Sequence, residues 1–188
     1  MTIEVDVIDS GLSDDLLKTA TQYCLFDELQ NFNPDLRQSN RMHYKYADPL
    51  METILLQLKP LIEKRINKVI YPTYSYYRVY RNNGTLDRHL DRESCEISAS
   101  LSIGHNLNDP WPLFMGDQKI YLKPGELVLY PGCDLPHWRD RLQCDSNQYC
   151  VQGFFHYVSS DGPYLDFIFD KREGIGYPSN YKNYIVRK

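Results

Sequence analysis

The chain has 188 residues, 42% hydrophobic and 24% charged, a composition typical of a globular protein with a sizeable core. Its net charge of −4 and isoelectric point near 5.7 argue against a nucleic-acid-binding protein, whose binding domain is usually strongly basic. No apolar run approaches the roughly 18 residues of a membrane span, and the acidic N-terminal stretch lacks the pattern of a secretory signal. The five cysteines include no C-x-x-C pair, which favours reduced thiols. We therefore expect one domain over residues 1–188 in the cytoplasm, with no nucleic-acid or membrane partner and an oligomeric state that the sequence leaves open.

Residues 1–70 predict two helices. The first, over residues 13–26, begins with Ser13 as a cap followed by two acidic residues, which suit the positive end of a helix. The second, over residues 48–70, begins with Asp48 as a cap and Pro49 at the first helical position. Apolar residues recur along it at helical spacing and predict one buried face: Met51, Leu55, Leu58, Ile62, Ile66 and Val69.

Residues 71–158 predict a β-rich core. Short runs of β-branched and aromatic residues are separated by Gly, Pro, Asn and Asp, at residues 74–81, 95–104, 112–115, 119–132 and 149–158. Within the fourth run, residues 123–125 (KPG) predict a tight hairpin turn. Successive strands without intervening helices indicate antiparallel pairing, so we expect a mainly β fold, a barrel or jelly roll, with the helices packed outside. Residues 159–188 are expected to wrap this core or to form part of a lid.

The candidate chemistry begins with His89 and Asp91 in the stretch "YRNNGTLDRHLD". A His-x-Asp pair alone is a weak signal, and its plain alternative is a capping aspartate beside a surface histidine. His137 strengthens the signal, because it follows an apolar strand that runs out through a Pro-Gly turn. Two histidines and one carboxylate are the ligands of the facial triad that binds iron(II) and leaves the opposite positions open.

The remaining histidines fit this site less well. His43 precedes the second helix, His105 is expected in a turn, and His156 shares a strand face with Phe154. Each is expected to be a surface or hydrogen-bonded core histidine. Tyr80 is expected to point into the barrel, where its hydroxyl needs a partner such as a bound carboxylate, although it could equally be one of several core tyrosines.

Four segments, "YRNNGTLDRHLD", "CEISASLSIG", "PGELVLYPGCDLPHWRD" and "QGFFHYV", together resemble the iron(II)/2-oxoglutarate-dependent dioxygenases, and within them the prolyl-4-hydroxylase-like branch. The resemblance runs from about residue 74 to residue 158. It implies a double-stranded β-helix (jelly roll) with N-terminal supporting helices. It also implies that His89, Asp91 and His137 are the iron ligands and that Tyr80 helps to bind 2-oxoglutarate. The implied reaction hydroxylates an unactivated C–H with Fe(II), 2-oxoglutarate and O2, with ascorbate as an optional addition, and releases succinate and CO2.

The sequence departs from that family on the closing strand, where residues 151–154 (VQGF) contain no basic residue to pair with the distal carboxylate of 2-oxoglutarate. A buried carboxylate without a cation would be strongly destabilised. Arg139, two residues after His137, is the favoured replacement, with Ser100 as a hydroxyl partner. Arg78, two residues before Tyr80, is a second candidate, whereas Arg141 is expected to be a solvated surface charge.

The substrate is less well defined by the sequence. The resemblance favours a prolyl residue of a peptide, and the short chain would also suit an amino-acid-like small molecule. Trp111 and Trp138 could stack on such a ring or belong to the core. Arg88 and Arg92 could face an anionic group or solvent. Two alternatives remain: a non-catalytic jelly-roll binding module with a vestigial metal site, and a cupin-like metalloenzyme that does not use 2-oxoglutarate.

Overall fold

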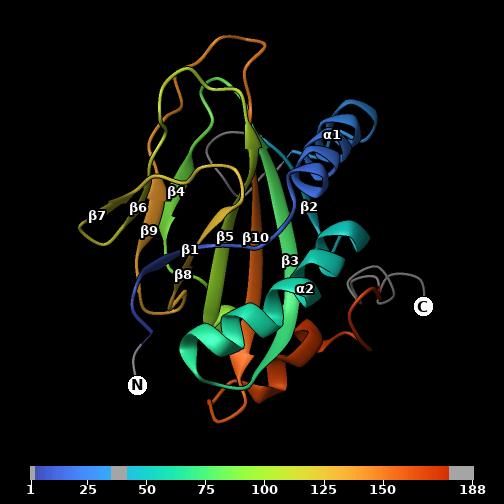
Figure 1. Ribbon diagram of the computed structural model, residues 1–188, viewed down its shortest axis with the longest axis vertical. Helices are drawn as coiled ribbons and strands as arrows, with labels where there is room; N and C mark the ends of the chain where they lie inside the picture. The colour runs from blue at the N-terminus through green and yellow to red at the C-terminus, as the bar shows by residue number, and fades with distance from the viewer. Residues whose placement is uncertain (1–2, 35–41, 178–188) are drawn as a thin grey trace, which may run out of the picture.

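The computed structural model describes residues 3–34 and 42–177, which form two antiparallel sheets and two long helices (Figure 1). The larger sheet has six strands in the order β1 (Asp6–Asp9), β8 (Glu126–Tyr130), β5 (Ile97–His105), β10 (Cys150–Ser159), β3 (Ile70–Tyr80) and β2 (His43–Tyr46). The smaller sheet has four, in the order β4 (Leu86–His89), β9 (His137–Arg139), β6 (Leu113–Met115) and β7 (Gln118–Ile120). The expected mainly β jelly roll with flanking helices is confirmed.

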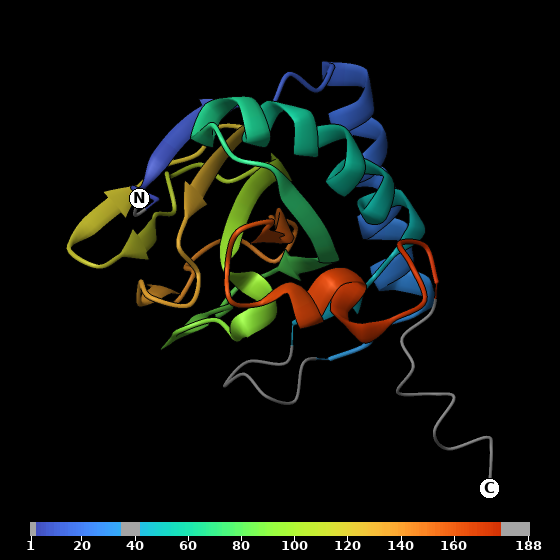
Figure 2. The same cartoon turned by 90° about the horizontal axis from the view of Figure 1, so that it is seen from below.

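The two helices lie side by side on one face of the larger sheet (Figure 2). Helix α1 (Asp14–Gln30) begins as predicted, with the Ser13 hydroxyl accepting a hydrogen bond from the Leu16 N–H, and continues past the expected end at residue 26. Helix α2 (Pro49–Ile66) is capped by Asp48, whose carboxylate accepts from the N–H groups of Leu50 and Met51.

The predicted extension of α2 to residue 70 is wrong. Asn67 adopts a left-handed conformation with φ of 52°, which ends the helix, and Ile70 already begins β3. Val69 therefore lies outside the helix and is 56% exposed instead of packing in the core.

The predicted turn at residues 123–125 exists, but it does not join a hairpin. The Glu126 N–H donates to the Lys123 carbonyl, and Gly125 has the positive φ of 90° that a type II turn requires at this position. The strands on its two sides, β7 and β8, belong to different sheets. The turn therefore carries the chain from one sheet to the other.

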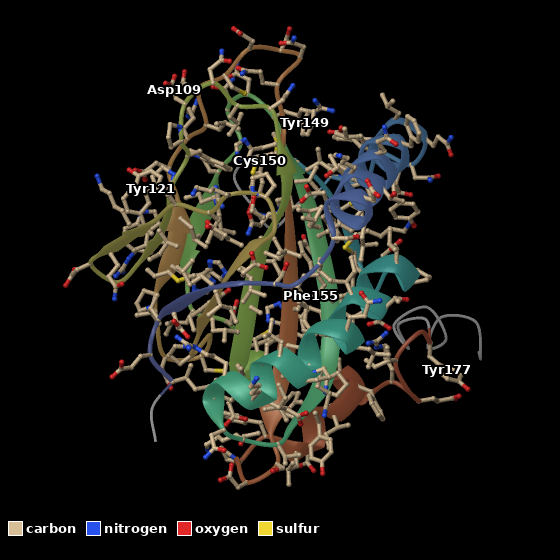
Figure 3. All side chains as sticks on the ribbon, in the orientation of Figure 1. Asp109, Tyr121, Tyr149, Cys150, Phe155 and Tyr177 are labelled. Atoms are coloured by element: carbon tan, nitrogen blue, oxygen red, sulfur yellow. The ribbon has the colours of Figure 1, made fainter. Side chains whose placement is uncertain are left out.

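Residue alternation gives the larger sheet two different faces. Most buried odd-numbered residues of β3, β5 and β10 are apolar and pack with α1 and α2; one of them is Phe155, labelled in Figure 3. Thr73 and Ser75 of β3 are buried polar exceptions among them. Even-numbered residues of the same strands point toward the smaller sheet, and several of them are buried polar side chains: Arg78, Ser98, Ser100, Ser102, Gln152 and His156. The core that stabilises the fold and the interior that can do chemistry thus lie on opposite sides of one sheet.

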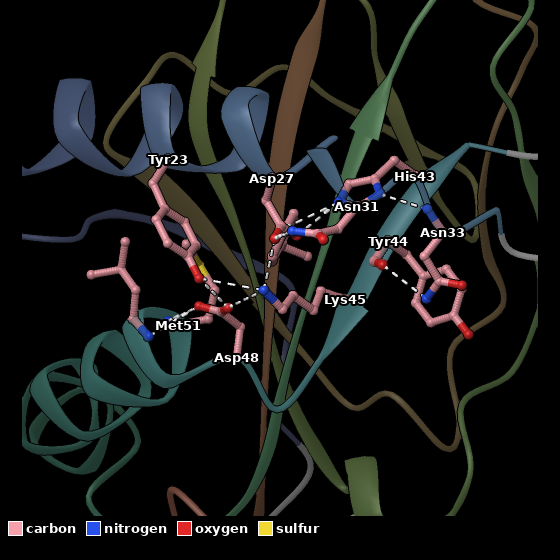
Figure 4. A network of polar contacts seen from close by, with 11 residues as sticks. Tyr23, Asp27, Asn31, Asn33, His43, Tyr44, Lys45, Asp48 and Met51 are labelled. Carbon is pink, nitrogen blue, oxygen red and sulfur yellow. Dashed lines mark hydrogen bonds and ion pairs between the residues drawn. The ribbon is translucent and has the colours of Figure 1, made fainter. Parts of the chain in front are cut away.

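A polar network ties the edge strand β2 to both helices (Figure 4). The Asp27 carboxylate accepts from the Tyr77 hydroxyl at 2.5 Å, from the Lys45 ammonium at 2.9 Å and from the His43 ring at 3.1 Å. Burial raises the pKa of Asp27, but hydrogen bonds from Tyr77, Lys45 and Asn31 outweigh it and lower the pKa to about 2. Lys45 also pairs with Asp48 at the start of α2. His43 is therefore a hydrogen-bonded core histidine, one of the two environments that the sequence predicted for it.

The described part of the C-terminal tail packs against the end of the larger sheet through η2 (Leu165–Lys171), and residues 178–188 lie outside the description (Figure 2). Arg172 forms a fully buried ion pair with Glu52 of α2 at 2.7 and 3.0 Å and donates to the Thr73 carbonyl of β3. Asp170 pairs with Arg92 through two hydrogen bonds of 2.7 and 2.8 Å. The tail is thus bound both to α2 and to the residue that follows Asp91.

Within residues 3–34 and 42–177, none of the helices combines the length and the apolar character that a membrane crossing requires.

We predict that Arg172→Met lowers the free energy of unfolding by about 3–5 kcal/mol, because it leaves the Glu52 carboxylate buried without its cation. Lys68→Met is the matched control, since it removes a cation from the exposed pair with Asp161 and should cost at most about 1 kcal/mol. Urea denaturation of the three proteins measures both losses. Equal losses for the two variants would contradict the buried ion pair.

Candidate metal centre

The site is built where β4 and β9 pair. In the register of this pair His89 lies directly opposite His137, and their rings are 4.3 Å apart between centroids. His137 is 2% exposed and the Tyr130 ring packs edge-on against it at 4.9 Å. Two histidines that are 48 positions apart in sequence are therefore brought side by side by strand pairing.

Asp91 completes the group just beyond the end of β4. Its Oδ1 atom lies 3.4 Å from Nε2 of His89 and 3.6 Å from Nε2 of His137. Its backbone N–H donates to the Gly132 carbonyl at 3.0 Å, which fixes the chain where it leaves the strand. Ligand atoms of all three residues lie within 4.8 Å of one another. This is a donor set of two imidazoles and one carboxylate.

Backbone carbonyls fix the orientation of both imidazoles. Nδ1 of His89 lies 2.7 Å from the Asp87 carbonyl, and Nδ1 of His137 lies 3.0 Å from the Leu135 carbonyl. A carbonyl can only accept, so each Nδ1 carries a proton, and in the neutral ring each Nε2 has a lone pair that a metal ion could use. Histidines that bind metals are commonly held in this way. The residues therefore fit a divalent metal ion.

Asp91 and the two histidines shift one another's pKa values. Burial raises the pKa of Asp91, but His89, His156 and His137 outweigh it and hold the pKa below its usual range. Burial lowers the pKa of His137, and Asp91 only partly offsets this. For His89, burial also lowers the pKa, but Asp91 and the Asp87 carbonyl outweigh it and raise the pKa overall. An ionised carboxylate next to a neutral His137 is the protonation state that a metal ion needs.

A cavity of about 260 Å³ opens beside the three residues. Its wall includes four aromatic side chains from the larger sheet, Tyr74, Tyr76, Tyr130 and Phe154. Sequence reasoning did not single out these aromatics, because nothing local distinguishes them from the other tyrosines and phenylalanines of the chain. The pairing of β3 with β10 places aromatic residues of both strands on one inward face. Knowledge of this pairing would have identified them.

The residues predicted to bind 2-oxoglutarate gather in the same interior. Arg139 follows His137 on the same face of β9 and is 4% exposed. Its guanidinium donates to the Gln152 side chain at 3.0 Å and to the Trp111 carbonyl at 2.9 Å, and Gln152 donates in turn to Ser100 at 2.9 Å. Tyr80 is fully buried and its ring centroid lies 6.0 Å from the Arg139 guanidinium carbon.

The two arginine candidates occupy different places. Arg78 is 3% exposed, lines the cavity with the metal-binding group, and donates to the Tyr76 and Tyr80 hydroxyls. Arg139 lies beyond Tyr80 and is not part of the cavity wall. However, no carboxylate among the described residues lies within ion-pair distance of Arg139. Arg141 is exposed, as expected.

Other sequence expectations are refined. His105 is the last residue of β5 and does not lie in a turn. Trp111 and Trp138 do not line the cavity: Trp111 packs on Tyr80, and Trp138 stacks on Phe114. Arg92 does line the cavity, while it pairs with Asp170.

A second group of metal-binding type, Asp91, Cys95 and His156, shares Asp91 with the first. Burial raises the pKa of the Cys95 thiol, which disfavours the thiolate that a metal would require. Burial lowers the pKa of His156 to about 4, so this imidazole stays neutral and could bind a metal, and it is the Cys95 thiol that disfavours the second group. The first group is therefore the better metal site.

Comparison with known proteins gives matches in structure alone: neither a family model nor a curated protein matches the sequence. A prolyl-4-hydroxylase from Pseudomonas putida matches with a TM-score of 0.62 at 18% identity, over 82% of this chain and 92% of that one. The 2-oxoglutarate-dependent epimerase SnoN from nogalamycin biosynthesis matches with a TM-score of 0.66 at 8% identity, over 82% and 77%. EctD from S. alaskensis, solved with 2-oxoglutarate and 5-hydroxyectoine, matches with a TM-score of 0.61 at 13% identity, over 93% and 83%.

This is the fold of the 2-oxoglutarate–Fe(II) oxygenases. The matching structures include both a hydroxylase and an epimerase. The fold alone therefore does not determine the reaction.

We predict that Gly132→Ala weakens binding of a divalent metal at least 10-fold, since an added Cβ would lie 2.5 Å from Oδ2 of Asp91 and 2.5 Å from Oγ of Ser98. The control is Gly174→Ala, whose Cβ would meet only the Tyr177 ring at 3.4 Å. Calorimetric titration with Mn²⁺ compares the two variants with wild type. Unchanged affinity in Gly132→Ala would show that the position of Asp91 does not govern binding.

Proposed function

We propose that the protein is an Fe(II)/2-oxoglutarate-dependent oxygenase that hydroxylates an unactivated C–H bond. The observation that carries the proposal is the convergence of His89, Asp91 and His137, with both Nε2 atoms directed at one carboxylate oxygen. When bound, iron(II) and 2-oxoglutarate supply the oxygen activation for this chemistry, in which 2-oxoglutarate is converted to succinate and CO2.

The protein's own part in this reaction is to hold three ligands on one side of the ion. Both histidines are fixed by carbonyls of their own strand segments, so little reorganisation is needed on binding. Because the three ligands occupy one face, the positions toward the cavity stay open for 2-oxoglutarate and O2. Aromatic side chains from the larger sheet form part of the wall beside those positions.

We assign the distal carboxylate of 2-oxoglutarate to Arg139. A buried guanidinium without a carboxylate is costly, and an anionic ligand would relieve that cost. Two residues of strand separate Arg139 from His137 by about 6.6 Å, a length comparable to that of a five-carbon dicarboxylate. Its bonds to Gln152 and Trp111 use two of its five N–H groups, so donors remain for a ligand. Arg78 lines the cavity with the metal-binding group and donates to the Tyr80 hydroxyl, and Ser100 accepts a hydrogen bond from Gln152.

The cavity argues for a small group at the reacting position. Its volume of about 260 Å³ must hold part of 2-oxoglutarate as well as substrate. The space left suits a single ring or side chain, either a prolyl residue of a peptide or an amino-acid-like small molecule, packed against the aromatic wall.

We predict that wild type, supplied with Fe²⁺ in air, releases succinate from 2-oxoglutarate, and that His137→Ala falls to the level of the metal-free protein, because a metal ligand is lost. The control is His105→Gln at the end of β5, which should retain the release. Chromatographic measurement of succinate tests this. Equal release by wild type and His137→Ala would exclude the oxygenase.

Two further measurements separate the alternatives. A non-catalytic binding module would release no succinate, and tight, iron-dependent binding of 2-oxoglutarate would count against it. A cupin-like metalloenzyme would consume oxygen with 2-oxoglutarate omitted.

We predict that Arg139→Met raises the KM for 2-oxoglutarate about 30-fold or more, corresponding to about 2 kcal/mol for a lost charge-assisted interaction. Arg141→Met, on an exposed arginine two positions later, is the matched control and should leave KM unchanged. Initial rates of succinate release give both values. An unchanged KM in Arg139→Met, with a raised KM in Arg78→Met, would move the assignment to Arg78.

A further inference from the structure

The two carboxylate oxygens of Asp91 have different surroundings. Oδ1 faces Nε2 of both histidines, at 3.4 and 3.6 Å. Oδ2 points the other way and accepts a hydrogen bond from the Ser98 hydroxyl at 3.0 Å. A metal held by Nε2 of both rings would therefore meet only one of the two oxygens.

Ser98 is a fully buried residue of β5, on the inward face of the larger sheet. Besides Oδ2 of Asp91, its Oγ lies 2.9 Å from Nδ1 of His156 and 3.1 Å from the Cys95 carbonyl. A hydroxyl has one proton to donate, and both the carboxylate and the carbonyl can only accept.

His156 decides where that proton goes. If Nδ1 of the neutral ring carries its proton, it donates to Ser98, and the hydroxyl proton remains free for an acceptor. The carboxylate is the shorter and the charged acceptor, so the bond to Asp91 is the stronger one. The opposite tautomer would draw the Ser98 proton toward His156 and leave two oxygen atoms facing each other without a proton between them.

We propose that Ser98, oriented by His156, is a positioning residue that keeps Asp91 a one-oxygen ligand of the metal. The inference rests on the proposed function. A carboxylate that turned to bind through both oxygens would occupy a second coordination position. That position is one of those the oxygenase needs for 2-oxoglutarate or O2. The Ser98–His156 pair therefore protects an open position on the metal, and neither residue touches the metal itself.

Ser98→Ala tests this with Co²⁺, whose electronic absorption spectrum reports coordination number. We expect a 10- to 100-fold loss of Co²⁺ affinity, a changed Co²⁺ spectrum, and weaker binding of 2-oxoglutarate to the Co²⁺ protein. The matched control is Ser75→Ala, another fully buried serine of the same sheet, whose hydroxyl has no hydrogen-bond partner in the described structure. It should leave all three measurements unchanged.

His156 supplies a second, independent pair of variants. His156→Asn keeps an N–H donor close to the position of Nδ1, whereas His156→Leu removes it. We expect the Asn variant to retain the wild-type Co²⁺ spectrum and the Leu variant to resemble Ser98→Ala. This rescue separates a positioning role from a loss of packing, since both variants remove the ring.

The outcomes are distinct. A wild-type spectrum and affinity in Ser98→Ala, or equal behaviour of the two His156 variants, would overturn the positioning role while leaving the oxygenase proposal intact. A wild-type protein that binds no Co²⁺ would overturn the metal site and the proposed function with it.

Discussion

The pairing of β4 with β9 is the constraint on which the rest of the site depends. It sets His89 opposite His137 in register, and a shift of one residue would turn one imidazole to the other face of the sheet. Asp91 can join them only because the chain leaves β4 two residues later and is held there by the Gly132 carbonyl. The close approach to Asp91 also explains why position 132 has no side chain. The candidate metal centre is therefore a property of strand register more than of any local motif.

The larger sheet keeps the stabilising apolar core and the polar interior of the site on opposite faces. Its outer face joins α1 and α2 in an apolar core, whose burial is the main stabilising contribution of the fold. Its inner face carries buried polar groups that would be costly if left unsatisfied. Most of these groups bond to one another, as Gln152 does to Ser100 and Arg139. Arg139 of β9 joins this network through neutral acceptors alone, because none of the described residues offers it a carboxylate.

Much of this fold could be predicted because its signals are local. The caps Ser13 and Asp48 predicted the starts of both helices, and runs of β-branched and aromatic residues between turn residues predicted the strands. Of the two expectations that failed, one depended on pairing with distant strands and the other on a local helix end. The residue 123–125 turn was predicted correctly, but the sheets to which its flanking strands belong are decided by pairing with distant strands. Val69 continued the helical spacing, but Asn67 had already ended the helix.

The site could be predicted less completely. The sequence predicted His89, Asp91 and His137 as metal ligands, and the structure brings these three residues together. Their role as ligands remains a prediction. The roles of Ser98 and His156 were missed, because a serine and a histidine 58 positions apart become neighbours only when β5 pairs with β10. Residues that position a ligand from distant strands form no motif of fixed spacing in the sequence.

A crystal structure with Mn²⁺ in place of iron and with 2-oxoglutarate, in which anomalous scattering locates the metal, tests the metal centre directly. We expect one ion bonded to Nε2 of His89, Nε2 of His137 and a single oxygen of Asp91. An ion bound instead by Cys95 and His156, or no ion within bonding reach of both His89 and His137, would contradict this expectation.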